Sequence, residues 1–206
     1  MAGQLKSPPL VEALLEIKWK LNKIAPDTFE DPGYRLASGR LYDRISKRFG
    51  FIQNLPISAI PEELTAYTAR QQFRTSKNGW PLVQLGPGVA TVNFTSPYTW
   101  RKFRDTVKFF VPHLVESYRG VISEDKDSTL ETTSILLRYI NAVEMDWSQN
   151  NTLEYLSTNL HSNFTLPTGI SDSDLIEGMP VNINLQVGHQ ISNPKGQALI
   201  RIATGN

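Results

Sequence analysis

The sequence predicts an α+β fold, and three observations indicate it. Several segments alternate apolar and polar residues as strands do, two segments repeat apolar residues at helical spacing, and Asn78-Gly79 is typical of a hairpin turn. The composition is that of a folded protein, because 40% of the 206 residues are hydrophobic and 20% are charged. A chain of this length can bury a core without disulfides or metals, as one large domain or two small ones.

The first strand and the first helix are marked by their apolar spacing. A strand is expected where apolar residues recur at every second position: Val11, Ala13, Leu15, Ile17, Trp19 and Leu21. Asp31 and Pro32 form an N-cap and first-turn signal, and Gly50 is a stop signal. Between them, helical spacing is followed by Tyr34, Ala37, Leu41, Ile45 and Phe49.

A hairpin and a second helix follow. Residues 67–74 alternate in polarity up to the Asn78-Gly79 turn, and the return strand is expected from Leu82 to about Phe94, with a bulge or sharp bend at Gly86-Pro87-Gly88. Ser96 and Pro97 repeat the cap signal, and the helix after them should end near Gly120 and be kinked or divided at Pro112. Its apolar face comprises Trp100, Phe103, Val107, Phe110, Val111, Leu114 and Tyr118.

The last core strand completes the predicted topology. The stretch from Thr132 to Val143 is rich in β-branched and apolar residues, which predicts a largely buried strand. The resulting order, β-α-β-β-α-β, is ferredoxin-like: an antiparallel sheet of strand order 4-1-3-2 with both helices on one face, over residues 1–145. Residues 146–206 are expected to add a helix near Asn151–Phe164 and a β-hairpin around the turn Asn193–Gly196.

Composition excludes several classes of site. The chain has no cysteine, so disulfides, thiol nucleophiles and cysteine-ligated metals are excluded, and only His113, His161 and His189 remain as imidazole ligands. His113 and Glu116 stand three residues apart on the second helix, a spacing that is commonly incidental. No catalytic residues, metal site or cofactor are therefore assigned. No signal core or membrane-spanning stretch occurs, so a cytoplasmic protein without membrane contact is expected.

Charge is distributed unevenly along the chain. Residues 1–120 hold 17 Lys and Arg against 10 Asp and Glu, whereas residues 121–206 hold 4 against 10. Two basic helical surfaces result, formed by Arg40, Arg44, Lys47 and Arg48 on the first helix and by Arg101, Lys102, Arg104 and Lys108 on the second. They could follow a phosphate backbone, although ordinary solvated helix faces have the same composition.

Arg138 stands in an otherwise apolar strand, where a buried guanidinium needs a partner. In the predicted sheet the first strand lies beside this one, so we expect Glu12 or Glu16 to approach Arg138 in a structural ion pair. If Arg138 faced a cleft without a carboxylate, it would become an anion-binding candidate, because its planar fork suits phosphate or carboxylate groups.

Three motifs resemble a known family. Pro8-Pro9-Leu10-Val11-Glu12-Ala13, Trp80 to Gly88 (WPLVQLGPG) and Leu137-Arg138-Tyr139-Ile140-Asn141 resemble a sporadically distributed bacterial family of roughly 250 residues. The resemblance extends to about Asn163 and implies a cytoplasmic α+β protein, with no activity or catalytic residue to transfer. Relatives continue with another strand and helix, which suggests a truncated chain or a short member.

The sequence therefore favours a non-enzymatic binding or assembly protein that acts on a macromolecular partner through its sheet edge or its basic helical face. A protein partner or a homo-oligomer is expected. The alternative is a nucleic-acid-binding protein or a nuclease, such as a component of a mobile defence system, and it rests on the basic helices.

Overall fold

The computed structural model describes residues 9–95, 97–121, 130–144, 152–163 and 183–204. The chain divides into two compact units, Met1–Val143 and Glu144–Asn206. Each unit is described by itself.

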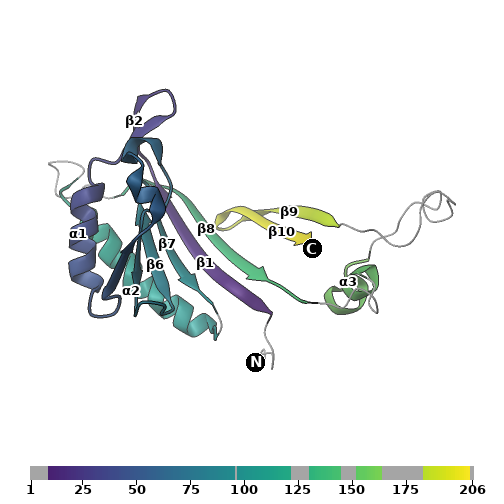
Figure 1. Cartoon of the computed structure of the whole chain (residues 1–206). Coiled ribbons are helices and arrows are strands. Elements are labelled where there is room, and N and C mark those ends of the chain that lie inside the picture. Colours follow the sequence, from purple (N-terminus) through teal and green to yellow (C-terminus); the bar gives the residue numbers. More distant parts are fainter. Residues whose placement is uncertain (1–8, 96, 122–129, 145–151, 164–182, 205–206) are drawn as a thin grey trace. The chain divides into compact units, whose positions relative to one another are not determined.

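The first unit is built on a six-stranded antiparallel sheet (Figure 1). Its strands, in spatial order, are β4 (Phe51–Asn54), β5 (Gln71–Arg74), β6 (Leu82–Gly86), β7 (Val89–Phe94), β1 (Leu10–Trp19) and β8 (Thr132–Asn141). Every neighbouring pair is antiparallel, so β1 lies between β7 and β8, with Leu15 opposite Val92 on one side and Leu137 on the other. The two edges of this sheet are β4, with four residues, and β8, with ten.

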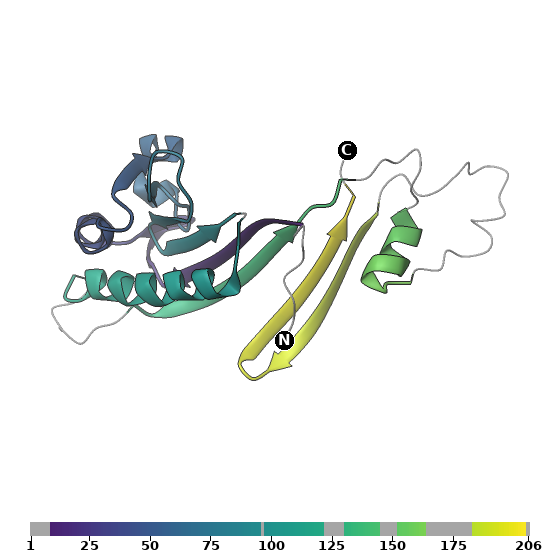
Figure 2. The ribbon, with the colours of Figure 1, turned by 90° about the horizontal axis from the view of Figure 1, so that it is seen from below.

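Two helices cover one face of this sheet. Helix α1 (Tyr34–Ile45) and helix α2 (Trp100–Tyr118) contact each other, and α2 also contacts β7 (Figures 1 and 2). Both helices contribute to one apolar core with the strands, in which the largest fully buried side chains include Trp19, Phe73, Phe103, Phe110 and Tyr118. Removing these side chains from water is the main stabilising contribution to the fold.

The ferredoxin-like strand order expected from the sequence requires correction. Gly86-Pro87-Gly88 does not bend a single strand; it turns the chain between β6 and β7, which pair with each other antiparallel. Gly88 has φ +75°, a conformation that favours glycine, and a Cβ on Gly86 would lie 1.9 Å from the Thr68 carbonyl oxygen. With the additional edge strand β4, the core becomes a six-stranded sheet instead of the order 4-1-3-2.

Other elements also depart from expectation. A small hairpin of β2 (Asn22–Ala25) and β3 (Thr28–Glu30) and two short 3₁₀ helices, η1 (Pro56–Ala59) and η2 (Glu62–Leu64), carry no strong periodic signal. Helix α2 begins after Thr99, whose hydroxyl accepts a hydrogen bond from the Lys102 amide, and it runs through Pro112 without dividing.

Asp31 is not the N-cap of α1; Gly33 occupies that position. The Asp31 carboxylate lies buried between β1, the β6–β7 turn and the end of α2. One oxygen accepts hydrogen bonds from Trp19 Nε1 (3.1 Å), the Tyr118 hydroxyl (3.0 Å) and the Gly88 amide (3.1 Å), and the other accepts from the Gly33 amide (3.2 Å). A short polar side chain thereby joins segments that are far apart in sequence.

The second unit contains helix α3 (Thr152–Leu160) and the paired strands β9 (Asn184–Ser192) and β10 (Lys195–Ala203). Val187 and Ile200 face each other on one side of this ribbon, and both are at least half exposed. None of the helices in the described ranges is both long enough and apolar enough to cross a membrane.

Candidate functional site

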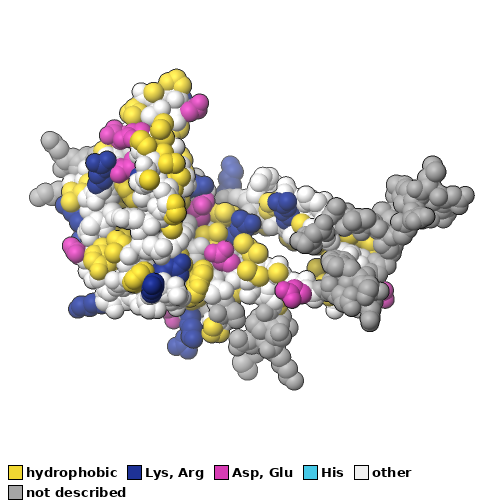
Figure 3. All heavy atoms as spheres, viewed as in Figure 1, with side chains coloured by type: hydrophobic (Ala, Val, Ile, Leu, Met, Phe, Trp, Pro, Cys, Tyr) yellow, Lys and Arg dark blue, Asp and Glu magenta, His cyan; other side chains and the backbone are white. Residues whose placement is uncertain are grey.

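Strand β8 is a long edge strand whose apolar side chains are exposed on both faces. Ile135 is 69% exposed, and Leu136, Leu137 and Tyr139 are each more than 40% exposed. Leu137 and Tyr139 lie on the helix-covered face, opposite Leu15 and Ala13 of β1, whereas Leu136 lies on the other face, opposite Glu16. Apolar side chains are exposed in the region of Figure 3 that corresponds to β8 in Figure 1.

The expectation of a largely buried strand over Thr132–Val143 was therefore wrong. Its apolar composition suggested burial, but among the described residues β8 pairs with a strand on one side alone, and α2 packs against β7 nearer the middle of the sheet. A strand at this position leaves a row of backbone N–H and C=O groups without partners in the ladder. Natural edge strands are usually short, rich in charged residues or interrupted by proline, whereas β8 has ten residues, no proline and a single charged side chain, Arg138.

Arg138 is exposed and forms no ion pair among the described residues. The two strands are neighbours, as expected: Arg138 of β8 stands opposite Leu14 of β1, between Glu12 and Glu16 on the same face. The expected ion pair is not formed. Glu12 accepts a hydrogen bond from Asn93 Nδ2 (2.7 Å), and Glu16 pairs with Lys18 (2.9 Å). Because Arg138 is solvated, it needs no buried carboxylate, and its guanidinium stays available on the edge strand.

Helix α1 ends at Ile45, before the expected stop at Gly50, so Lys47 and Arg48 of the predicted basic surface lie just after the helix. The three arginines of this surface are engaged with α2 or with the residue that follows it. Arg40 donates a hydrogen bond to the Arg119 carbonyl oxygen (3.1 Å), and Arg44 lies 4.0 Å from Glu116. Arg48 donates to the Thr106 hydroxyl, and its guanidinium stacks 5.1 Å from the centre of the Phe109 ring. Partial burial lowers the pKa of Arg48, because desolvation disfavours the charged form. These three arginines therefore stabilise the packing of the two helices.

The basic residues of α2 are divided between paired and solvated groups. Arg101 and Arg104 both approach Asp105, at 4.0 and 3.6 Å. Lys102 and Lys108, and Lys47 in the turn after α1, are exposed and make no ion pair within the described part of the chain. The structure thus brings the two basic helices together, but many of their basic side chains already form hydrogen bonds or ion pairs within the protein.

The histidine-carboxylate spacing on α2 does not form a pair. His113 packs edge-on against Phe109, with ring centres 4.8 Å apart, whereas Glu116 pairs with Arg119 (3.2 Å) and approaches Arg44. Among the described residues there is no group of three acidic, histidine or cysteine side chains arranged to hold a metal ion.

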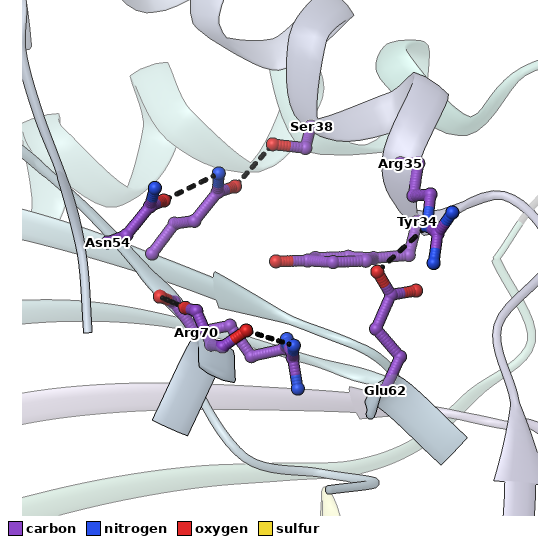
Figure 4. A pocket seen from close by; sticks show the side chains of 8 residues that line it. Tyr34, Arg35, Ser38, Asn54, Glu62 and Arg70 are labelled. Atoms are coloured by element: carbon purple, nitrogen blue, oxygen red, sulfur yellow. Dashed lines mark hydrogen bonds and ion pairs between the residues drawn. The ribbon is translucent and has the colours of Figure 1, made fainter. Parts of the chain in front are cut away.

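A polar pocket lies beside α1 on the helix-covered side of the sheet (Figure 4). Its volume is about 310 Å³, and its lining comes from α1, β4, the two 3₁₀ helices and β5: Tyr34, Arg35, Ser38, Asn54, Ser58, Glu62, Arg70 and Gln71. At the rim, Arg35 Nε donates to a Glu62 carboxylate oxygen (2.9 Å). Inside, Arg70 is 6% exposed and holds the loop between β4 and β5 by donating to the carbonyl oxygens of Ser58 (3.0 Å) and Ile60 (2.7 Å).

Tyr34 occupies the middle of the pocket (Figure 4). Burial raises the pKa of its hydroxyl to about 12, an effect that the neighbouring Arg70 guanidinium partly opposes. The hydroxyl is therefore neutral at physiological pH and can donate a hydrogen bond. Tyr98 also has a raised pKa, through burial and its hydrogen-bonding contact with the Tyr139 hydroxyl (3.1 Å).

Sequence reasoning did not find this pocket. Of the lining residues, the sequence indicated only Tyr34, as a member of the apolar series of the first helix, and it assigned none of them to a binding site. The two 3₁₀ helices that close the pocket have no periodic pattern in the sequence; one begins at Pro56 and the other follows Pro61.

Comparisons of this chain with protein-family models, with curated proteins and with solved structures find no match.

Proposed function

We propose that this chain is a non-enzymatic binding or assembly protein that pairs β8 with an extended segment of a protein partner. The observation that carries the proposal is the exposure of β8: a ten-residue edge strand with four large apolar side chains, Ile135, Leu136, Leu137 and Tyr139, each more than 40% exposed. Strand addition to a free sheet edge is a common mode of peptide recognition.

Such pairing would use both the backbone and the side chains of β8. An added strand satisfies the outward N–H and C=O groups and so gains affinity from main-chain hydrogen bonds. Its side chains would pack against Ile135 and Leu137 on one face and against Leu136 on the other. The occupant that fits is therefore an extended segment with apolar residues on both faces and without proline.

Charge favours a carboxylate in that segment. Arg138 is the one charged residue of β8, and neither Glu12 nor Glu16 is bonded to it. An Asp or Glu opposite Arg138 on the partner would complete a cross-strand pair. Arg138 thus remains an anion-binding candidate, with a carboxylate of the partner strand as the anion.

The proposal is tested by selecting extended peptides from a displayed random library against the full chain. We expect the selected peptides to be apolar on both faces, to carry an acidic residue and to lose binding when alternate backbone nitrogens are methylated, because N-methylation removes ladder donors. Peptides that tolerate methylation at every position, or that contain proline throughout, would contradict strand addition.

Nucleic-acid binding is the competing hypothesis, and it is tested by titrating DNA and RNA, single- and double-stranded, at low and physiological salt. Arg40 and Arg44 of α1 and Arg48 just after it are engaged with α2 or its C-terminal end, so we expect no salt-dependent complex. A steeply salt-dependent complex that is weakened by Lys102→Glu and Lys108→Glu would favour the nucleic-acid hypothesis over the protein partner.

A further inference from the structure

The pocket beside α1 contains a buried cation without a carboxylate partner. Arg70 is 6% exposed, and among the described residues none of its contacts is an ion pair. Its guanidinium donates to two carbonyl oxygens and to the Thr65 hydroxyl, and it hydrogen-bonds the Tyr34 hydroxyl. A buried guanidinium that is balanced only by neutral groups favours the approach of an anion.

The opposite wall of the pocket has free amide N–H donors. The Ser38 hydroxyl donates to Gln71 Oε1, and Gln71 Nε2 donates to Asn54 Oδ1 (3.2 Å) (Figure 4). This relay uses the acceptor oxygen of both amides. One N–H of Gln71 and two of Asn54 have no acceptor among the described residues, so they are free to bind a ligand.

The remaining polar groups fit the same kind of ligand. Tyr34 is 5% exposed, and its neutral hydroxyl adds a further donor beside Arg70. One oxygen of Glu62, the acidic residue of the lining, is bonded by Arg35 at the rim. The lining contains two positively charged residues, Arg35 and Arg70, and one negatively charged residue, Glu62, so its net charge is positive by one.

We propose that this pocket binds a small ligand through one anionic group, a carboxylate or a phosphate, held between the Arg70 guanidinium and the amide donors of Asn54 and Gln71. The volume of about 310 Å³ limits the ligand to the size of a small metabolite. This site is on the helix-covered side of the sheet and is independent of strand addition at β8.

The test is a titration of the full chain, isotopically labelled, with inorganic phosphate and separately with acetate, followed by nuclear magnetic resonance. We expect saturable shifts of the Asn54 and Gln71 side-chain amide signals with at least one of the two anions. Acetate represents the carboxylate and inorganic phosphate represents the phosphate group, so the probe that binds with higher affinity identifies the anionic group that the site prefers.

The decisive variant is Asn54→Asp, which keeps the shape of the side chain but replaces its donors with negative charge. Asn54 is exposed, so the fold should tolerate the change. We expect affinity for the anion to fall roughly tenfold or more, because a donor to a charged group is lost and repulsion is added. The matched control is Gln53→Glu, which adds the same charge on the opposite face of β4 and should leave affinity within about twofold.

Three outcomes would overturn the proposal. The first is the absence of saturable shifts with both anions. The second is equal weakening by Asn54→Asp and by Gln53→Glu, which would indicate general electrostatic attraction. The third is shifts confined to the exposed lysines, Lys47 after α1 and Lys102 and Lys108 of α2, which would indicate adventitious binding.

Discussion

The Asp31 carboxylate is a buried acceptor that connects distant segments of the first unit. It accepts four hydrogen bonds, from Trp19, Tyr118 and the amides of Gly33 and Gly88. The indole and phenol that donate to it also pack edge-to-face, with ring centres 5.2 Å apart. The energetic importance of Asp31 therefore comes from the buried donors that would be left without an acceptor if it were removed.

We expect Asp31→Asn to lower the free energy of unfolding by about 2 kcal/mol or more, because the new NH₂ group would face donors instead of accepting from them. Urea unfolding of the purified full chain measures this. Asp43→Asn is the control: Asp43 is exposed on α1, and its substitution should change stability by no more than about 0.5 kcal/mol. Equal effects of the two substitutions would show that the hydrogen bonds to Asp31 contribute little.

Tyr34 and Tyr118 should make the fold sensitive to alkali. Burial raises the pKa of Tyr34 from its usual value of 10 to about 12, and burial and Asp31 raise that of Tyr118 well above 10. The unfolded chain releases these protons near pH 10, whereas the folded chain retains them. The stability that they contribute is thus complete below pH 10 and is lost as pH rises toward 12 and beyond.

Unfolding free energies measured from pH 9 to pH 12 should therefore decline above pH 10. In Tyr34→Phe the decline should be smaller, because one of the three tyrosines with a raised pKa is absent, and tyrosinate absorbance should show late ionisation of Tyr98 and Tyr118. A decline of the same size in Tyr34→Phe and in the unchanged chain would contradict the assignment to Tyr34.

At the scale of elements, the β6–β7 turn depends on glycine. Gly88 has φ +75°, and a Cβ there would approach Tyr67 and Leu21 within 3 Å. We expect Gly88→Ala to destabilise the chain by about 2 kcal/mol or more, through left-handed strain and a steric clash. Gly39→Ala should instead stabilise it by about 0.5–1 kcal/mol, because Gly39 lies inside α1 with open space around it. Thermal unfolding of the two variants distinguishes these opposite signs.

The β8 edge can be blocked by one charge. Leu137→Lys places an ammonium group in the middle of the strand, and natural edge strands use such lysines to prevent pairing. We expect affinity for selected peptides to fall roughly tenfold or more. Stability should change little, because Leu137 is already 46% exposed. Leu36→Lys, on α1 and similarly exposed, is the control and should leave peptide affinity unchanged. Peptide binding that survives Leu137→Lys would exclude β8 as the edge.

The sequence predicted the elements whose residues carry strong local signals. The alternation in β1 and the helical spacing in α1 and α2 are confirmed, since each reflects packing against one shared core. It could not predict the division of residues 82–94 into β6 and β7, because a Gly-Pro-Gly segment is compatible with either a bend or a turn. The choice between them is made by tertiary contacts, such as the hydrogen bond from the Gly88 amide to Asp31.

The candidate sites were harder to predict for a related reason. Apolar composition does not reveal whether a strand is central or at an edge, so β8 was expected to be buried. Likewise, the spacing of Arg40, Arg44 and Arg48 predicted one basic helix face, but only the packing of α2 shows that these arginines are engaged, and Arg48 lies beyond the end of α1. The pocket is assembled from segments without periodicity, and its donors become evident only in three dimensions.

For the whole molecule, the two edges of the sheet have different properties. The β4 edge is four residues long, whereas the β8 edge offers ten residues and four large exposed apolar side chains. A protein that exposes such an edge must protect it from uncontrolled pairing, and a specific partner strand would do so. This asymmetry is the reason for assigning the binding function to β8.

The most direct test is amide hydrogen exchange of the full chain, measured residue by residue with and without a selected peptide. If a strand adds to β8, alternate amides of Thr132–Asn141 should gain protection, because only the outward N–H groups find new acceptors. The amides of α1 and α2 should not change. Protection confined to the helices, or no periodic gain along β8, would contradict strand addition at this edge.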